Sequence, residues 1–137
     1  MKMKKNFLLI LSLTIFSVIA VVYGFLYALW PQVMVDASGS DPVPSGWLRW
    51  AGAIMFALGI GSVIVLRKPS NQGIFVTTLA LGTLLCGLAL IYSSLFELAG
   101  IGNIWHTLLP GIVIVLLSVL LWVCLNQYKA LLFEGEV

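Results

Sequence analysis

Four long apolar stretches, almost free of charged residues, dominate this chain of 137 residues and restrict what it can fold into. A helix needs about 20 apolar residues to cross roughly 30 Å of hydrocarbon, and stretches of that length occur at about residues 7–30, 47–66, 73–96 and 104–126. With 61% hydrophobic and only 9% charged residues, the composition is far from that of a soluble domain. The sequence therefore predicts one all-α domain over residues 1–137, an integral membrane bundle of four transmembrane helices.

The beginning of the chain allows a second interpretation. "MKMKK" followed by an apolar run, with Val18 and Ala20 at positions that a signal peptidase accepts, resembles a secretory signal. The apolar run continues to Trp30, however, which is well beyond the usual hydrophobic region of about 7–15 residues in a signal peptide. We expect this segment to be retained as the first helix.

The positions of the basic residues predict the orientation of the chain. In a four-span chain, all Lys and Arg residues except Arg49 fall on one side: Lys2, Lys4, Lys5, Arg67, Lys68 and Lys129. Cytoplasmic loops carry the excess of Lys and Arg, so both termini are predicted to be cytoplasmic. Tryptophan favours the membrane interface, and four of the five tryptophans fall at the predicted outer helix ends: Trp30, Trp47, Trp50 and Trp105.

Small residues at four-residue spacing predict which helix faces pack together. Association in lipid depends on close approach through small side chains, because the hydrophobic effect does not separate a helix from lipid. Such stripes occur at Ala20, Gly24 and Ala28, at Ala53, Ala57 and Gly61, and at Thr78, Gly82 and Cys86. The fourth span has no such stripe, and we expect it to face more lipid or a partner chain. Homodimerisation through one stripe is an alternative.

The candidate site is at the predicted outer face, where Arg49 stands between Trp47 and Trp50. Glu97 and His106 lie at similar depth at the ends of the third and fourth spans, with Asp36 and Asp41 on the loop above. In one interpretation Arg49 pairs with Glu97 and the indole rings flank the guanidinium. In the other, Arg49, Trp47, Trp50, Glu97 and His106 bind an anionic ligand, such as a lipid phosphate or a carboxylate.

A catalytic interpretation would use the same side chains. His106 would act as general base or acid, oriented by Glu97, and Arg49 would stabilise an anionic transition state. No spacing motif supports this chemistry, so we assign no catalytic residue.

Several other functions are not expected. No Asp, Glu, Lys, Arg or His stands near the middle of a span, where a proton-coupled transporter needs an ionisable residue. Cys86 and Cys124 lie at different depths and outside any C-x-x-C pair, and we expect neither metal nor cofactor. The basic residues are too few for a nucleic-acid surface.

The stretch from Gly24 to about residue 69 contains "GFLYALWP", a polar loop and "WLRWAGAIMFALGI" ending in "LRKP". Through Gly24, Pro31, Arg49 and Gly52 it resembles the small uncharacterised bacterial four-helix membrane proteins called DoxX-like. The resemblance implies four membrane helices and a multi-pass protein of the bacterial cytoplasmic membrane, and it implies no activity.

We therefore expect a non-catalytic membrane protein, an accessory or small subunit that docks a membrane protein partner or a second copy of itself. The first alternative is an outer-face binding protein for a lipid or an amphipathic small molecule. The second alternative is a lipid-modifying enzyme.

Overall fold

The computed structural model describes residues 6–39, 45–97 and 104–134. The elements in these residues are all helical: α1 (Phe7–Leu29), α2 (Pro31–Ser38), α3 (Gly46–Arg67), α4 (Gly73–Tyr92), a π-helical turn at Ser93–Glu97 that continues α4, α5 (Trp105–Gln127), and a π-helical turn at Ala130–Glu134. The described part of the chain contains no strand.

Four of these helices are long and apolar enough to cross a membrane: α1, α3, α4 with its π-helical turn, and α5. They coincide with the four predicted stretches. The prediction of an all-helical chain with four membrane-spanning helices is thus confirmed. The side of the membrane on which the termini lie stays a prediction, and Lys2, Lys4 and Lys5 fall outside the described residues.

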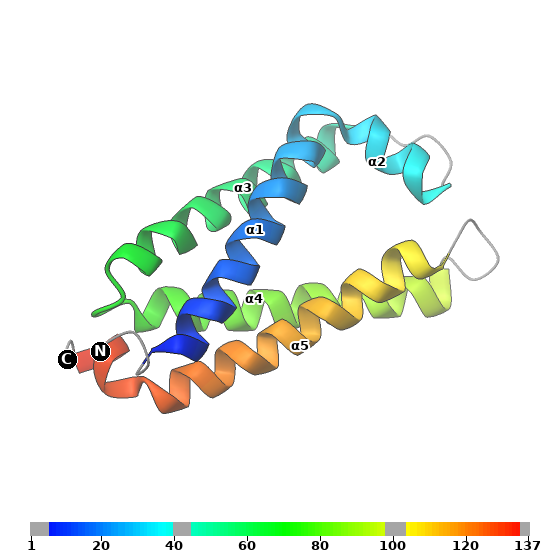
Figure 1. Cartoon of the computed structure of the whole chain (residues 1–137). Helices are drawn as coiled ribbons and strands as arrows, with labels where there is room; N and C mark the ends of the chain where they lie inside the picture. Colours follow the sequence, from blue (N-terminus) through cyan, green and yellow to red (C-terminus); the bar gives the residue numbers. More distant parts are fainter. Residues whose placement is uncertain (1–5, 40–44, 98–103, 135–137) are drawn as a thin grey trace.

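The spanning helices are arranged as two antiparallel pairs, α1 with α3 and α4 with α5 (Figure 1). Both pairs meet at the end where α1 begins and α5 finishes, here called the closed end. They diverge toward the opposite end, here called the open end, where α3 and α5 begin (Figure 1). Contacts within each pair far outnumber contacts between the pairs.

The shared core explains this shape, because it lies only in the closed-end half. Its members come from all four helices and the C-terminal turn: Leu9, Leu13, Phe16, Ala20, Val65, Val76, Leu79, Ala80, Leu117, Leu121, Cys124, Leu125, Leu131 and Leu132. Beyond Ala20 on α1 and Ala80 on α4, no residue belongs to this core. In the open-end half each helix therefore packs mainly on its own partner.

Interlocked glycines join α1 to α3. A Cβ at Gly24 would lie 2.5 Å from the backbone nitrogen of Phe56, and a Cβ at Gly52 would lie 2.5 Å from that of Ala28. Glycine is needed at both positions because the two backbones touch there. Nearer the closed end, a Cβ at Gly59 would lie 3.0 Å from the backbone nitrogen of Val21.

The α4–α5 pair uses the same device. A Cβ at Gly87 would lie 2.9 Å from the carbonyl oxygen of Gly111, and the reciprocal distance from Gly111 to the Gly87 oxygen is 3.2 Å. Nearer the closed end, the Ser118 hydroxyl donates a buried 2.7 Å hydrogen bond to the Ala80 carbonyl. Between the pairs, Ser12 on α1 and Cys124 on α5 approach to 3.4 Å.

The predicted stripes have different outcomes. The first is confirmed, since Ala20 and Gly24 are buried and Ala28 is half-buried. The second is right only at Gly61, which approaches the Phe75 ring of α4, since α3 packs through Leu48, Gly52 and Gly59 instead of Ala53 and Ala57. The third is wrong within this chain, because α4 leaves Thr78, Gly82 and Cys86 exposed. Each helix carries small residues on more than one face, so spacing alone does not select the face that packs.

The expectation that the fourth span faces more lipid or a partner chain stays a prediction. In its most apolar stretch α5 is 33% buried, against 28% for α3 and for α4. Gly111 and Ser118 give α5 small contact positions seven residues apart, a spacing that the search for four-residue stripes does not detect.

The loop after the first span contains the short helix α2. Pro31 at its first position suits a helix start because no N–H is needed there, and Gly39 ends it in the left-handed conformation. Pro31 and Val35 are buried. In Figure 1 α2 extends from the open end of α1 toward the open ends of α4 and α5.

We predict that Gly24→Val destabilises the protein by about 1–3 kcal/mol or more, because the added side chain forces the two backbones apart. Gly82→Val is the matched control, since a Cβ at Gly82 meets nothing within 4 Å. The free energy of unfolding in mixed micelles, followed by helicity, measures both effects. Equal losses in the two variants would contradict the interlocked contact.

Candidate functional site

Arg49 occupies the first turn of α3, at the open end. Its side chain is exposed, and Nη1 donates a 3.1 Å hydrogen bond to the carbonyl oxygen of Ala28. That carbonyl belongs to the last turn of α1, where carbonyls lack the helical partner that interior ones have. The guanidinium therefore caps the neighbouring helix, and among the described residues this is the bond that it makes, with one of its five N–H donors.

The tryptophans gather at the same end. Trp47 is 59% and Trp50 is 68% exposed on the protein surface, and Trp30 and Trp105 are exposed as well. Exposed indole rings at helix ends are typical of the membrane interface. Trp30 also makes an edge-to-face contact with Phe25, with ring centroids 5.5 Å apart.

Glu97 and His106 belong to the other helix pair. The Glu97 carboxylate accepts a 2.5 Å hydrogen bond from the Ser93 hydroxyl within its own π-helical turn. His106 is exposed in the first turn of α5. Both are carried by the pair that diverges from α3 at the open end (Figure 1).

The structure thus brings Arg49, Trp47 and Trp50 together on α3 and does not join them to Glu97 and His106. The Arg49 guanidinium contacts the Ala28 carbonyl, and Glu97 is engaged by Ser93. Asp36 accepts a hydrogen bond from Gln32 on α2, and Asp41 lies outside the described residues. A role of these five side chains in binding one ligand stays a prediction.

Between the helix pairs lies a second candidate region, called the wedge here and defined by Tyr23, Tyr27, Gly82 and Cys86. Tyr23 and Tyr27 stand one turn apart on α1, with ring centroids 6.4 Å apart. Tyr27 and Cys86 on α4 lie near each other across the space between the pairs. Gly82 is one turn from Cys86 and has no neighbour within 4 Å of where a Cβ would be. Two tyrosines of α1 and two small residues of α4 therefore border the space between the pairs in the open-end half.

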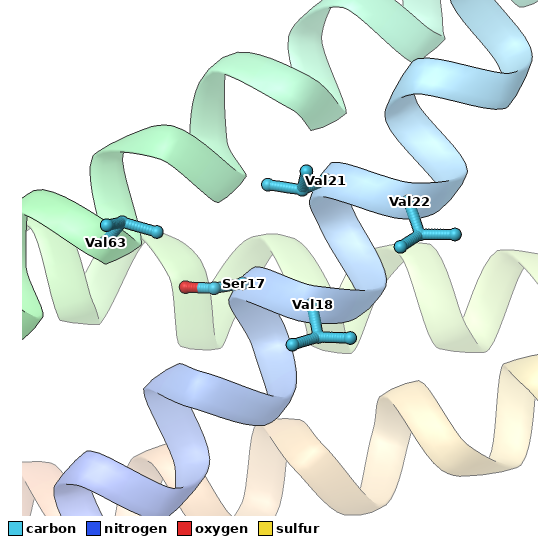
Figure 2. Close-up of a pocket in the computed structure, with 5 residues that line it drawn as sticks. All are labelled: Ser17, Val18, Val21, Val22 and Val63. Carbon is cyan, nitrogen blue, oxygen red and sulfur yellow. The ribbon is translucent and has the colours of Figure 1, made fainter.

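A third candidate is a hollow on the other side of α1, with a volume of about 290 Å³. Figure 2 shows its lining: Ser17, Val18, Val21 and Val22 of α1 and Val63 of α3. Val18 and Val22 are exposed, on the side of α1 opposite to the buried Phe16 and Ala20. The hollow therefore faces away from the second helix pair.

The sequence interpretation missed the wedge and the hollow. Two tyrosines four residues apart, in a helix otherwise mostly aliphatic, are a signal for a polar face that the search for charged residues overlooked. The hollow has no such signal, because its valines resemble any lipid-facing residues.

Metal ligation has no basis in the described residues, where no group of three or more His, Cys, Asp or Glu side chains could hold an ion. Cys86 is exposed and Cys124 is buried, and both are free thiols.

Comparison with known proteins adds no relative. No protein-family model matches the chain, and neither a curated protein nor a solved structure matches it. The fold itself defines the class, an all-helical multi-pass membrane protein.

We predict that Arg49→Met lowers the free energy of unfolding by about 0.5–1.5 kcal/mol, the value of one hydrogen bond, because the Ala28 carbonyl loses its donor. Arg49→Lys can still donate and should retain most of the stability. Unfolding of both variants beside the wild type in mixed micelles measures the difference. A loss in Arg49→Lys as large as in Arg49→Met would show that this hydrogen bond is not the cause.

Proposed function

We propose that this chain is a non-catalytic subunit of a membrane protein assembly and that its wedge receives a transmembrane helix of a partner protein. The observation that carries the proposal is the confinement of the shared core to the closed-end half. The facing surfaces of the two pairs have no common core beyond it.

A helix suits the wedge better than lipid tails do. Small residues let helix backbones approach closely, and hydroxyl groups form hydrogen bonds between helices in lipid. The wedge offers both, with Gly82 and Cys86 on α4 and Tyr23 and Tyr27 on α1. Saturated acyl chains have no atoms that the tyrosine hydroxyls can bond to.

The non-catalytic part of the proposal rests on the separation of the ionisable side chains. Arg49 lies on one helix pair, and Glu97 and His106 lie on the other. General acid–base catalysis needs its groups within hydrogen-bond reach of one reacting atom.

The setting of this function follows from the charges. Arg67, Lys68 and Lys129 lie at the closed end and Arg49 at the open end, so the positive-inside rule favours a cytoplasmic closed end and cytoplasmic termini. The DoxX-like resemblance of residues 24–69 favours the bacterial cytoplasmic membrane. The wedge would then open toward the outer face.

Cys86 provides the test, because it is the exposed one of the two cysteines. A thiol-specific photo-crosslinker on Cys86, applied in native membranes at near-native expression, should give one adduct of defined mass that contains a different membrane protein. Gly82→Leu should abolish the adduct, because the new side chain fills the space one turn away. Gly46→Leu is the control, since Gly46 also has open space around it but lies at the start of α3.

Each other outcome has a definite meaning. An adduct of two copies of this chain would replace the partner with a homodimer. A chain that remains monomeric and carries only lipid adducts, in the wild type and in Gly46→Leu, would end the subunit proposal.

A further inference from the structure

The hollow of Figure 2 lies on the side of the α1–α3 pair that faces away from α4 and α5, and the strip of this side between the hollow and Arg49 is called the groove here. On α3, the residues Arg49, Phe56 and Val63 follow each other at seven-residue spacing and so share one face of the helix. On α1, Val18, Val22 and Phe25 also share one face. The two faces border the same groove.

Three contacts tie these faces together from end to end. Arg49 bonds to the Ala28 carbonyl at the open end. Phe25 and Phe56 meet in the middle, with ring centroids 6.3 Å apart. Val63 lines the hollow together with Val18 and Val22 (Figure 2). The strip thus has a cation at one end, a pair of contacting aromatic rings in the middle and an aliphatic hollow at the other end.

The length of the groove fits one acyl chain. Ala28 and Ser17 are eleven residues apart, which corresponds to about 16 Å along the helix at 1.5 Å per residue. One leaflet supplies half of the bilayer core, or about 15 Å of hydrocarbon. A chain whose head group is at Arg49 would therefore end near the hollow.

Ser17 contributes the only polar side chain of the hollow. It is 5% exposed, and its hydroxyl has no hydrogen-bond partner among the described residues. Ser12 and Ser62 donate to the carbonyl four residues earlier, and a helical serine reaches that carbonyl by rotation of its side chain. The hydroxyl therefore does not require a polar occupant, and the small side chain leaves room between the valines.

We propose that this groove binds one glycerophospholipid, with its phosphate at Arg49 and one acyl chain along Phe25 and Phe56 into the hollow. The charge supports this occupant. The guanidinium suits a phosphate because its donors match the oxygens of that group, and Arg49 is the cation of the described residues at the open end. The carboxylates of Asp36 and Glu97 are engaged by Gln32 and Ser93 and do not neutralise it.

The groove and the wedge lie on different sides of α1, so the two proposals are independent. Val18 and Val22 point away from Phe16 and Ala20, which pack toward α4 and α5. Loss of a partner from the wedge leaves the lipid proposal intact, and the reverse also holds.

The test titrates palmitoyl phosphatidylglycerol into delipidated protein and measures the first binding step by native mass spectrometry. Arg49→Gln should weaken this step about tenfold or more, the effect of losing one charge-assisted hydrogen bond. Glutamine still carries an amide donor for the Ala28 carbonyl, so the loss reports on the charge. Arg67→Gln, at the closed end, is the matched control and should bind as the wild type does.

A second variant tests the part of the site that would hold the acyl chain. Val22→Trp places a ring across the groove at an exposed position, where it can be accommodated without refolding, and should also weaken the first step. Val119→Trp, exposed on α5, is the control. Phosphatidylglycerol with hexanoyl chains, and palmitoyl diacylglycerol without phosphate, should each bind more weakly to the wild type.

The outcomes separate the alternatives. Weaker first-step lipid binding in Arg49→Gln and in Val22→Trp supports the proposed site, provided that both control variants bind as the wild type does and that all four variants keep wild-type helicity. Loss in Arg49→Gln alone would mean an interfacial phosphate contact without an acyl-chain site. Equal binding by all variants, or equal losses in the control variants, would mean general lipid adhesion and would overturn the proposal.

Discussion

Direct contact between helix backbones at glycine is the interaction on which the rest of this structure depends. In lipid, apolar side chains gain nothing from leaving a solvent as apolar as themselves, so close packing has to hold the helices together. Gly24 with Gly52, and Gly87 with Gly111, provide that packing within each pair. Among the described residues no comparable contact joins the pairs in the open-end half, and this difference leaves the space between the pairs in which the wedge lies.

Arg49 shows how one side chain can serve both the fold and a ligand. Its hydrogen bond to Ala28 fixes the guanidinium at the junction of α1 and α3. A side chain held in this way has already lost conformational entropy, so the entropic cost of binding a ligand is smaller. The structural and the ligand-binding interpretations of this residue are therefore compatible, since the carbonyl uses one donor and leaves others for a phosphate.

The sequence predicted what depends on hydropathy and charge, and it missed what depends on the choice of face. The four spans and their ends were found because an uninterrupted stretch of about 20 apolar residues is typical of a membrane-spanning helix. The stripe at Gly24 was identified correctly, whereas Ala53 and Gly82 turned out to lie outside the packed faces of their helices, since small residues at four-residue spacing occur on packed and unpacked faces alike. The expected association of Arg49 with Glu97 assumed a compact bundle, and the divergence of the pairs places them on separate units.

The turn between α3 and α4 is the only stretch of chain that passes from one pair to the other. Asn71 adopts a left-handed conformation there, and its N–H donates to the carbonyl of Leu131 in the C-terminal segment, at 3.2 Å. Because the shared core lies at the same end, a rigid rotation of one pair against the other about this turn would displace the open ends most and the turn least. The C-terminal segment, bonded to the turn through Leu131, would keep its position during such a rotation.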